Sequence, residues 1–521
     1  MNAESTVPPW PTIGALLRDA AHRHGSREFL RFPQSSLSFA DVDQVTDHLA
    51  STLIARGLRP GDRVAIMMEN VADWPLSWFA IVKSGGIAVP VNARYQESDL
   101  AFVLRDSGAS LVLTTTEYVA LIRSVVVDIA TVKDVLTLPA LSMEMEGISP
   151  DRCDVAVESS DLANLQYTSG TTGFPKACML THDYWLRTAW SVSIHAELSS
   201  GDVVMMAQAF SYMDPQWTAL MCLMVGTPLV MLPRFSASGF WRSAREHGAT
   251  VTYVLGTMPL LLFKQPPNPS DRDNHMRLVL CSGIPRDLHA SLEQRWGARW
   301  REIYGSTETG LDLIVPPDAD ETVGTGAMGH PPLDKEVQVA DDAGTPRPVG
   351  EVGEILVRGR PMMEGYWNHP GSTDHAFRGG WFHTGDLGYI DDSGWIHHAG
   401  RLKDVIRRGG ENISAAEVEN VLEQHSAVLA SAVIAIPDEL FGELPMAFVL
   451  LRAGRKPDAD TALDIVGHAL RSLAKFKIPA YLVFRDKFPM TPSARIQKTK
   501  LLTPGTDPRS GAFNVATGSW T

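Results

Sequence analysis

The chain has 521 residues, of which 44% are hydrophobic and 20% are charged, and its net charge is −14. This is the composition of a folded globular protein, and the length predicts about three or four structural units. The acidic balance argues against nucleic acid or an anionic membrane surface as a partner, because proteins that bind either normally carry a basic surface.

The first part of the chain alternates between helical and strand patterns. Val42, Val45, Leu49 and Leu53 lie at helical spacing, and Gly57 follows them as a stop signal. A Pro-Gly-Asp turn at 60–62 then leads into the apolar run 64–68, which is typical of a buried parallel strand. The same device, a Gly-Asp turn before a short apolar run, returns at 200–206. We therefore predict two related α/β subdomains, at about 1–190 and 191–329.

The residue pattern changes after about residue 330, where glycine, proline and short alternating strand patterns such as 354–358 become frequent. We predict a β-rich subdomain over 330–400, which completes a large N-terminal domain over 1–400. A small, mobile α+β C-terminal domain is expected over 404–502, and the Gly-, Thr- and Ser-rich segment 503–521 is expected to be a flexible tail. The predicted fold class is thus α/β with a large and a small domain.

The cellular environment is indicated by two further features. The cysteines, Cys153, Cys178, Cys222 and Cys281, form no CxxC pair and are too few for a disulfide framework, so we expect a reduced, cytoplasmic environment. The uncharged stretches 215–233 and 247–263 are long enough to raise the question of a membrane span, but polar residues, glycines and prolines interrupt both. We interpret them as buried core and expect no membrane span.

A glycine- and hydroxyl-rich loop follows the strand pattern 162–167. It reads Tyr167-Thr168-Ser169-Gly170-Thr171-Thr172-Gly173-Phe174-Pro175-Lys176. Its glycines permit the positive φ of a tight anion-binding loop, its hydroxyls are donors, and Lys176 adds a positive charge, so the loop suits a polyphosphate. It is not a Walker A loop, because Pro175 precedes the lysine and Ala177 follows it. The alternative is an ordinary surface turn.

This loop resembles the signature of the adenylate-forming superfamily, which contains acyl- and aryl-CoA synthetases, luciferases and peptide-synthetase adenylation domains. The resemblance covers nearly the whole chain, and segment 206–300 is most similar to carnitine/crotonobetaine-type CoA ligases. Ala177 departs from the usual glycine, and we infer no loss of ATP binding from it. The resemblance implies ATP or the AMP moiety of an acyl-adenylate, coenzyme A and Mg²⁺ as cofactors.

Further motifs carry the resemblance in the expected order. One of them is Tyr304-Gly305-Ser306-Thr307-Glu308. The resemblance implies that Tyr304 stacks on adenine, that Thr307 contacts the α-phosphate and that Glu308 holds Mg²⁺. This ion commonly binds one carboxylate plus phosphates. The small-residue segment that would line the adenine pocket contains Gly283, Ile284 and Pro285.

The second half of the chain resembles the family's ribose-binding and hinge motifs. Asp386 would accept both ribose hydroxyls, Arg401 would reach the ribose or phosphate, and Lys403 would be the pivot of a hinge at 401–403. Gly409 and Gly410 would line a tunnel for pantetheine. For the neighbouring Arg407 and Arg408, a solvated basic turn and a contact to a coenzyme A phosphate remain equal alternatives.

An acyl pocket is expected from the same resemblance. It would hold an apolar carboxylic acid that is bulkier than acetate, and no fixed cation-binding group is evident. An aromatic core cluster is the alternative. The implied lining residues are Tyr212, Trp217, Tyr253, Gly256, Thr257, Gly305 and Ser306.

One position departs from the family in a way that bears on activity. Relatives carry Gly-Lys where this chain has Ala494-Arg495, and that lysine offsets charge at the phosphorus during adenylation. A guanidinium is a wide planar fork and does not replace a compact ammonium in register. Lys498 lies at an odd offset and is not expected to substitute for it.

The favoured hypothesis is therefore an acyl-CoA ligase that makes its thioester from an acyl-adenylate but adenylates weakly, with a separate enzyme supplying the adenylate. The alternatives are a full two-step ATP-dependent ligase and a non-catalytic protein that binds acyl-adenylate or coenzyme A.

Overall fold

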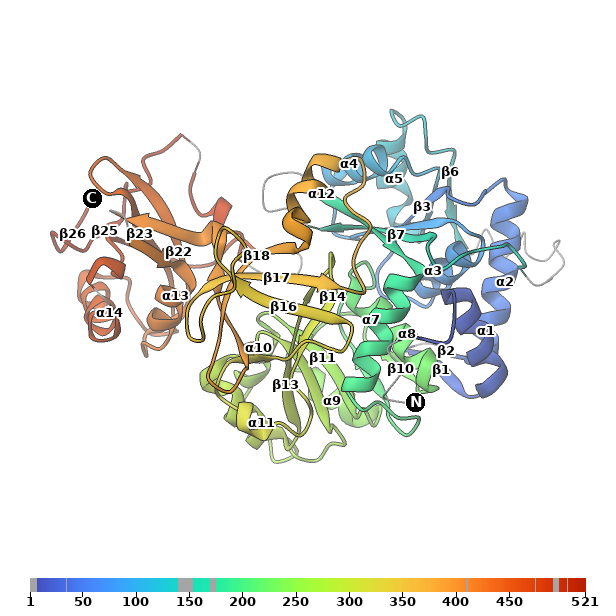
Figure 1. Cartoon of the computed structure of the whole chain (residues 1–521), viewed down its shortest axis with the longest axis horizontal. Helices are drawn as coiled ribbons and strands as arrows, with labels where there is room; N and C mark the ends of the chain where they lie inside the picture. The colour runs from blue at the N-terminus through green and yellow to red at the C-terminus, as the bar shows by residue number, and fades with distance from the viewer. Residues whose placement is uncertain are drawn as a thin grey trace. The chain divides into compact units, whose positions relative to one another are not determined.

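The computed structural model describes residues 7–33, 35–138, 153–168, 175–408, 411–473, 475–490, 496–503 and 505–521, without the side chains of Lys403, Arg407, Glu411 and Asn412. It divides into two compact units. The first comprises Met1–Val337 and Val357–Phe382, and the second comprises Gln338–Leu356 and His383–Thr521. Figure 1 traces the chain through both units. Among the described residues no helix is both long and apolar enough to cross a membrane.

The first unit contains two sheets. One has the order β14-β13-β12-β11-β9-β10-β1-β2 and is parallel from β13 to β1, with antiparallel strands at both edges. Its strands are β1 (Glu28–Phe32), β2 (Ser35–Ser38), β9 (Val204–Met206), β10 (Leu229–Met231), β11 (Val251–Leu255), β12 (Leu278–Ser282), β13 (Arg299–Ser306) and β14 (Gly310–Ile314).

The other sheet has the order β6-β5-β3-β4-β7-β8 and is parallel except for the β7–β8 hairpin. Its strands are β3 (Arg63–Met67), β4 (Ile87–Val91), β5 (Leu111–Thr114), β6 (Asp134–Thr137), β7 (Leu162–Thr168) and β8 (Lys176–Thr181). The two apolar runs that follow a Gly-Asp turn in the sequence form β3 and β9, one in each sheet.

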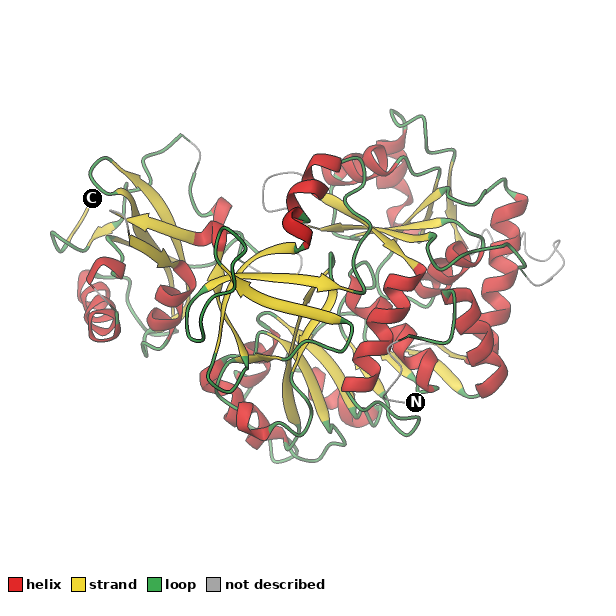
Figure 2. Cartoon of the chain, viewed as in Figure 1, coloured by secondary structure: helices red, strands yellow, loops and turns green. Residues whose placement is uncertain are grey.

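Helices connect these strands, as Figure 2 shows by colour. Helix α2 begins where Ser38 and Asp41 form a reciprocal capping box, and α7 begins where the Thr181 hydroxyl accepts the Tyr184 N–H. The helices of this unit are α1 (Ile13–His24), α2 (Phe39–Ala55), α3 (Asp73–Lys83), α4 (Glu97–Ser107), α5 (Val119–Val126), α7 (His182–His195), α8 (Met213–Val225), α9 (Phe240–Glu246), α10 (Met258–Phe263), α11 (His289–Trp296) and α12 (Pro370–Ala376); the short strand β15 is Ala327–Gly329.

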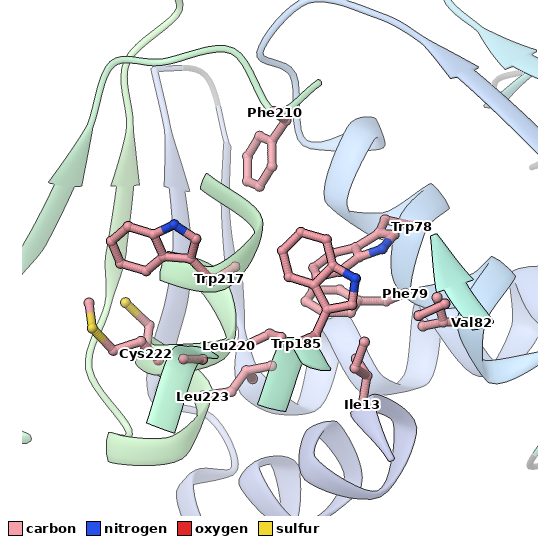
Figure 3. Close-up of a cluster of buried hydrophobic side chains, with 14 of the residues drawn as sticks. Ile13, Trp78, Phe79, Val82, Trp185, Phe210, Trp217, Leu220, Cys222 and Leu223 are labelled. Atoms are coloured by element: carbon pink, nitrogen blue, oxygen red, sulfur yellow. The ribbon is translucent and has the colours of Figure 1, made fainter. Parts of the chain in front are cut away.

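The largest core of this unit gathers tryptophans from several helices. Trp78 of α3, Trp185 of α7 and Trp217 of α8 belong to it, together with Phe210 (Figure 3). Trp78 donates its indole N–H to Asn164 Oδ1 over 2.9 Å, so a polar group in this core is paired. Helix α1 packs against α2, α3, α7 and α8. The uncharged stretch 215–233 is largely α8 and β10 of this unit, as expected for buried core.

The second unit combines a β-rich part and an α+β part. In the first part, strands run in the order β19-β18-β17-β16, with β16 (Lys335–Ala340) and β17 (Gly353–Gly359) crossing the boundary between the units, followed by β18 (Phe382–Ile390) and β19 (Ile396–Arg401). The α+β part has the order β21-β20-β23-β24-β25-β26, with β22 paired to β23. Its elements are β20 (Val405–Arg408), β21 (Glu411–Ser414), α13 (Ala415–Glu423), β22 (Val428–Asp438), β23 (Gly442–Leu451), α14 (Ala459–Ser472), β24 (Tyr481–Arg485), β25 (Phe513–Asn514) and β26 (Ser519–Trp520).

The fold class predicted from the sequence is confirmed. The end of the chain differs from expectation, because β25 and β26 extend the sheet within the segment expected to be a flexible tail. Phe513 is fully buried in the core of this unit and contacts the Trp520 ring at a centroid distance of 5.4 Å. Burial of the Phe513 ring, against which the exposed Trp520 ring packs, outweighs the entropy of a glycine-rich chain, which composition alone does not reveal.

Candidate active site

The phosphate-loop lysine stands at the base of a hairpin. Thr168 at the end of β7 pairs with Lys176 at the start of β8, so the ends of the loop are fixed. Lys176 Nζ lies 5.2 Å from the centroid of the Tyr366 ring. The loop residues predicted to bind phosphate between these strands, Ser169, Gly170, Thr171 and Thr172, lie outside the described residues.

The carboxylate predicted to hold Mg²⁺ meets the same tyrosine. Tyr366 donates its hydroxyl to Glu308 Oε1 over 2.9 Å, and the Met363 N–H donates to the Glu308 carbonyl over 2.8 Å. Burial, aided by the nearby Glu308, raises the pKa of Tyr366, so it remains a hydroxyl donor. Tyr184 donates to the Thr307 carbonyl over 2.9 Å. The predicted phosphate lysine and the predicted metal carboxylate are thus gathered around one ring.

This donor set fits magnesium bound together with a nucleotide. No group of three His, Cys, Asp or Glu side chains that could hold a metal ion occurs in the described part of the chain. Mg²⁺ commonly uses one or two carboxylates, retained water and substrate phosphates in place of an all-protein cage. Glu308 would hold the ion, and the ion would neutralise phosphate charge.

The predicted adenine segment is held by a carboxylate that motif matching missed. Glu302 of β13 accepts the N–H of Gly283 over 2.6 Å and that of Ile284 over 2.9 Å. Gly283 has φ of +94°, and a Cβ built there would meet no atom within 4 Å, so this glycine is required by its backbone conformation, with open space beside it. Pro285 follows and precedes a short 3₁₀ turn. Burial raises the pKa of Glu302 to about 7.

A signal for Glu302 does exist in the sequence. It precedes Tyr304 by two residues on one strand, so the two side chains share a face. That placement cannot be interpreted until β12 is known to lie beside β13.

A cavity of about 60 Å³ lies in the first unit where the acyl pocket is expected. One water molecule needs about 10–15 Å³ on the same measure, so the cavity has room for about four to six water-sized groups. Four of the predicted pocket residues line it, namely Trp217, Tyr253, Gly305 and Ser306. Tyr304 and Ser282 line it as well, and the residues not predicted are Thr188, Val192, Met213, Asp214, Ile303, Gly310 and Leu311.

The aromatic wall of this cavity is fixed by hydrogen bonds. The Trp217 and Tyr253 rings meet edge to face with a centroid distance of 5.6 Å. Tyr253 donates to Ser282 Oγ over 2.9 Å, and Ser282 donates to the Ile303 carbonyl over 2.6 Å. These aromatic side chains are therefore anchored at the cavity and not merely exposed to it.

Three predicted pocket residues are not among those that line this cavity. Tyr212 precedes α8, and its hydroxyl accepts a hydrogen bond from Asn92 Nδ2 over 3.0 Å. Burial raises the pKa of Tyr212 to about 12. Gly256 and Thr257 connect β11 to α10. None of the three lines the cavity, whereas Met213 and Asp214, directly after Tyr212, do.

In the second unit, the two residues predicted to contact ribose are neighbours. Asp386 of β18 pairs directly across the ladder with Arg401 of β19, and Arg401 Nε lies 2.8 Å from Asp386 Oδ1. His398 Nε2 lies 3.9 Å from the same oxygen, a neighbour that motif matching did not single out. The ion pair orients the carboxylate whose remaining acceptor capacity suits hydroxyl groups.

The C-terminal motif is framed by described residues on both sides. Met490 and Ile496 form an antiparallel bridge, and the Gln497 N–H donates to the Pro489 carbonyl over 2.8 Å. Lys498 Nζ lies 2.8 Å from Glu419 Oε1 and 3.3 Å from Asp404 Oδ2. Arg495 itself, Gly409, Gly410 and the side chain of Lys403 lie outside the described residues.

The fold and these motifs define the class of AMP-binding enzymes. The family model described as AMP-binding enzyme matches residues 17–367, and that of the AMP-binding enzyme C-terminal domain matches residues 417–495. The chain belongs to this family, as its motifs predicted. ATP or AMP, coenzyme A and Mg²⁺ are the cofactors of the adenylate-forming CoA ligases within it.

Named relatives match over nearly their whole length. A crotonobetaine/carnitine–CoA ligase of Salmonella typhi is 31% identical over 93% of this chain and 97% of the relative. A feruloyl-CoA synthase of an Amycolatopsis species is 32% identical over 94% and 97%. Among solved structures, ATP-bound MatB from Rhodopseudomonas palustris has a TM-score of 0.86 at 28% identity, covering 93% of this chain and 97% of that chain. The o-succinylbenzoate CoA synthetase of Bacillus subtilis, in complex with its acyl-adenylate intermediate, has a TM-score of 0.84 at 27% identity, covering 94% and 98%.

Proposed function

We propose that this protein is an acyl-CoA ligase that joins the acyl group of an acyl-adenylate to coenzyme A, and that its own adenylation of the free acid is weak. The single observation that carries the second part is Arg495 at the place of the family's catalytic lysine. The first part is supported by relatives and solved neighbours that are named CoA ligases or synthetases and that match over nearly their whole length.

The first half-reaction would join the acid to AMP. A carboxylate oxygen of the acid bonds to the α-phosphorus of ATP while the bond from that phosphorus to pyrophosphate breaks. Lys176 and Glu308 are gathered around Tyr366 where phosphates and their cation would be held. A carboxylate nucleophile needs no general base, so rate depends on positioning and on offsetting charge at phosphorus.

Arg495 is a poor substitute in that half-reaction. Loss of one well-placed charged donor costs roughly 10²–10³ in rate in other enzymes, and a guanidinium does not fit a slot shaped for an ammonium. The ion pairs of Lys498 with Glu419 and Asp404 support the expectation that it does not take over, because they occupy its ammonium within the second unit.

The second half-reaction would not need that lysine. The thiol sulfur of coenzyme A bonds to the acyl carbon, AMP leaves, and the thiol proton is released. A consequence of the proposal is that another enzyme supplies the acyl-adenylate. The full two-step ligase is the second candidate, and the intact arrangement of Glu308 with Tyr366 favours it, because a protein that never uses Mg-ATP has no need of it.

The experiment compares two supplies of the acyl group. The unmodified protein receives coenzyme A with either a prepared acyl-adenylate or the matching acid and Mg-ATP, across small aliphatic and aromatic acids, and thioester is measured by mass spectrometry. Thioester from the adenylate at least about 10²-fold faster than from the acid is expected. Equal rates would establish the two-step ligase, and thioester from neither would leave only a binding role.

The control variant is Arg495→Lys. It should raise thioester formation from acid and Mg-ATP while leaving the rate from prepared adenylate unchanged. An increase in both rates, or in neither, would contradict the assigned role of Arg495.

A further inference from the structure

A buried lysine of the first unit stands next to the turn that carries the metal carboxylate. The side chain of Lys335 is 0% exposed, and its Nζ lies 3.3 Å from Oδ1 of Asp312, which is equally buried. The same ammonium donates to the carbonyls of Thr309 and Pro361, each over 2.5 Å. An ammonium has three N–H donors, and Met362 Sδ lies 3.3 Å from the nitrogen as the third acceptor, so Asp312 Oδ1 faces the lysine as a charge partner.

A buried ion pair of this kind is weak evidence for a stabilising role. Apolar residues of similar volume are often as good for stability or better, because two charges must leave water. Burial accordingly lowers the pKa of Lys335 and raises that of Asp312. A gain in stability therefore does not explain why these two charges are buried, and the contacts that the pair makes give a better explanation.

One set of contacts reaches the wall of the acyl cavity. Thr309 donates its hydroxyl to Asp312 Oδ2 over 2.5 Å, and the Thr309 and Ser306 hydroxyls lie 2.8 Å apart. Because a hydroxyl has one hydrogen and that of Thr309 goes to the carboxylate, Ser306 is the donor to Thr309. The position of Ser306, which lines the cavity, is thus fixed through Thr309 by Asp312 and Lys335.

The other set of contacts holds Glu308 from the opposite segment. Lys335 ties the Pro361 carbonyl to the Thr309 carbonyl, which joins segment 361–366 to the turn 306–310. The joined segment supplies the Met363 N–H to the Glu308 backbone and the Tyr366 hydroxyl to its carboxylate. Lys335 thus fixes the position of segment 361–366, and this segment contacts Glu308 at both its backbone and its side chain.

We propose that Lys335 and Asp312 are positioning residues that hold the Glu308 carboxylate in register for a Mg²⁺–nucleotide complex and Ser306 at the wall of the acyl pocket. Neither is argued to touch substrate, metal or nucleotide. The inference deepens the proposed function and rests on it for the identity of the site. Outer partners of metal ligands typically matter by about 10–100-fold in metal affinity or activity.

The test uses a neutral pair and a matched control. Asp312→Asn/Lys335→Met removes both charges together, so neither is left unpaired. The control is Asp47→Asn/Lys83→Met. The Lys83 side chain is also 0% exposed and lies 2.9 Å from Asp47 Oδ1 and 2.5 Å from Asp43 Oδ1, between α3 and α2. Both variants disrupt a buried lysine–aspartate pair, but the Lys83 ammonium donates to Asp43 and Asp47 of α2, away from the two segments that contact Glu308.

The readout is the affinity for a non-hydrolysable ATP analogue with and without Mg²⁺, measured by calorimetry on the full chain. Asp312→Asn/Lys335→Met should lose about tenfold or more of the gain that Mg²⁺ gives, with unchanged affinity in its absence. Asp47→Asn/Lys83→Met should retain the wild-type gain even where its Tm falls as far. Equal behaviour of the two variants, or an absent Mg²⁺ gain in the wild type, would overturn the inference.

A milder variant covers the case in which the neutral pair does not fold. Thr309→Val keeps the volume and the Lys335 contacts but cuts the link from Ser306 to Asp312. It should raise the KM for the acid at least about threefold with acyl-adenylate formation as the readout, or with acyl-adenylate affinity where turnover is too slow. Unchanged values would overturn the role given to this link. Failure of the ligase proposal is seen separately, as absence of thioester from the wild type with either supply.

Discussion

Glu302 is the carboxylate through which we expect pH to act on the stability of the first unit. It accepts two backbone N–H groups beside the predicted adenine segment, and burial raises its pKa from 4.5 to about 7. Its native pKa lies above the unfolded value, so the native state binds the proton more tightly. The contribution to stability is therefore present at low pH and is lost as the pH rises from about 4.5 to about 7.

The size of the effect follows from this shift. With pKa values of 4.5 unfolded and about 7 native, the contribution falls by about 2.5 kcal/mol between pH 5 and pH 8. The residue keeps some solvent access, so this is an upper figure. His182 acts in the opposite direction, because burial lowers its pKa from 6.5 to about 4. The two must be separated by substitution, not by a single pH profile.

The perturbation is Glu302→Gln, which removes the titrating group. The amide can accept one of the two N–H bonds and leaves the other donor unpaired, so the variant should be about 1–3 kcal/mol less stable at pH 5. That deficit should shrink by up to about 2.5 kcal/mol by pH 8, because the wild type then carries the cost of a buried charge. His182 cancels in the difference.

The assay is urea unfolding of wild type and variant at pH 5, 6, 7 and 8, followed by tryptophan fluorescence. The transition assigned to the first unit is the one whose midpoint moves in the variant. A difference in free energy of unfolding that stays constant across this range would refute the reasoning and would place the native pKa of Glu302 near its ordinary value.

Three further outcomes are expected. The wild type should lose stability below pH 6.5, by about 2 kcal/mol at pH 5, because buried His182 is neutral in the native state and its Nδ1 accepts the Ile13 N–H. His182→Gln should remove this loss. Urea unfolding at pH 5 and pH 7.5 checks it, and an unchanged dependence of the free energy of unfolding on pH contradicts it. Trp217→Leu should shift kcat/KM by about tenfold or more towards longer acids, since it removes an aromatic wall from a cavity of about 60 Å³. Competition between acids of two lengths measures this, and an unchanged ratio of their kcat/KM values would mean that Trp217 is not a wall of the acyl pocket. Tyr366→Phe should weaken Mg²⁺-dependent nucleotide binding several-fold by removing the hydrogen bond to Glu308. Calorimetry with and without Mg²⁺ measures this, and a gain in nucleotide affinity from Mg²⁺ equal to that of the wild type would contradict it.

The sequence predicts the parts of this protein whose residues are informative on their own. Apolar runs after Gly-Asp turns locate β3 and β9, and contiguous motifs locate Lys176 and Glu308. It does not predict Tyr366, Glu302 or Lys335, because each acquires its role from a segment distant in the chain. Tyr366 lies 58 residues from the carboxylate it contacts, and no local period marks it. Predicting such partners requires the strand order first, since that order decides which strand ends meet.

The position of Arg495 in the chain predicts how a weak first half-reaction should appear in kinetics. The residues gathered around Tyr366 belong to the first unit, whereas the bridge that frames Arg495 belongs to the second. A defect that lies only at Arg495 leaves the first group of contacts to the nucleotide intact. The wild type should therefore bind Mg-ATP about as tightly as Arg495→Lys does, and differ in kcat for pyrophosphate release, which is the signature of an interaction made in the transition state. If Arg495→Lys instead lowered the Kd for Mg-ATP by the same factor as it raised turnover, the side chain would act in ground-state binding, and the argument from charge at the phosphorus would fail.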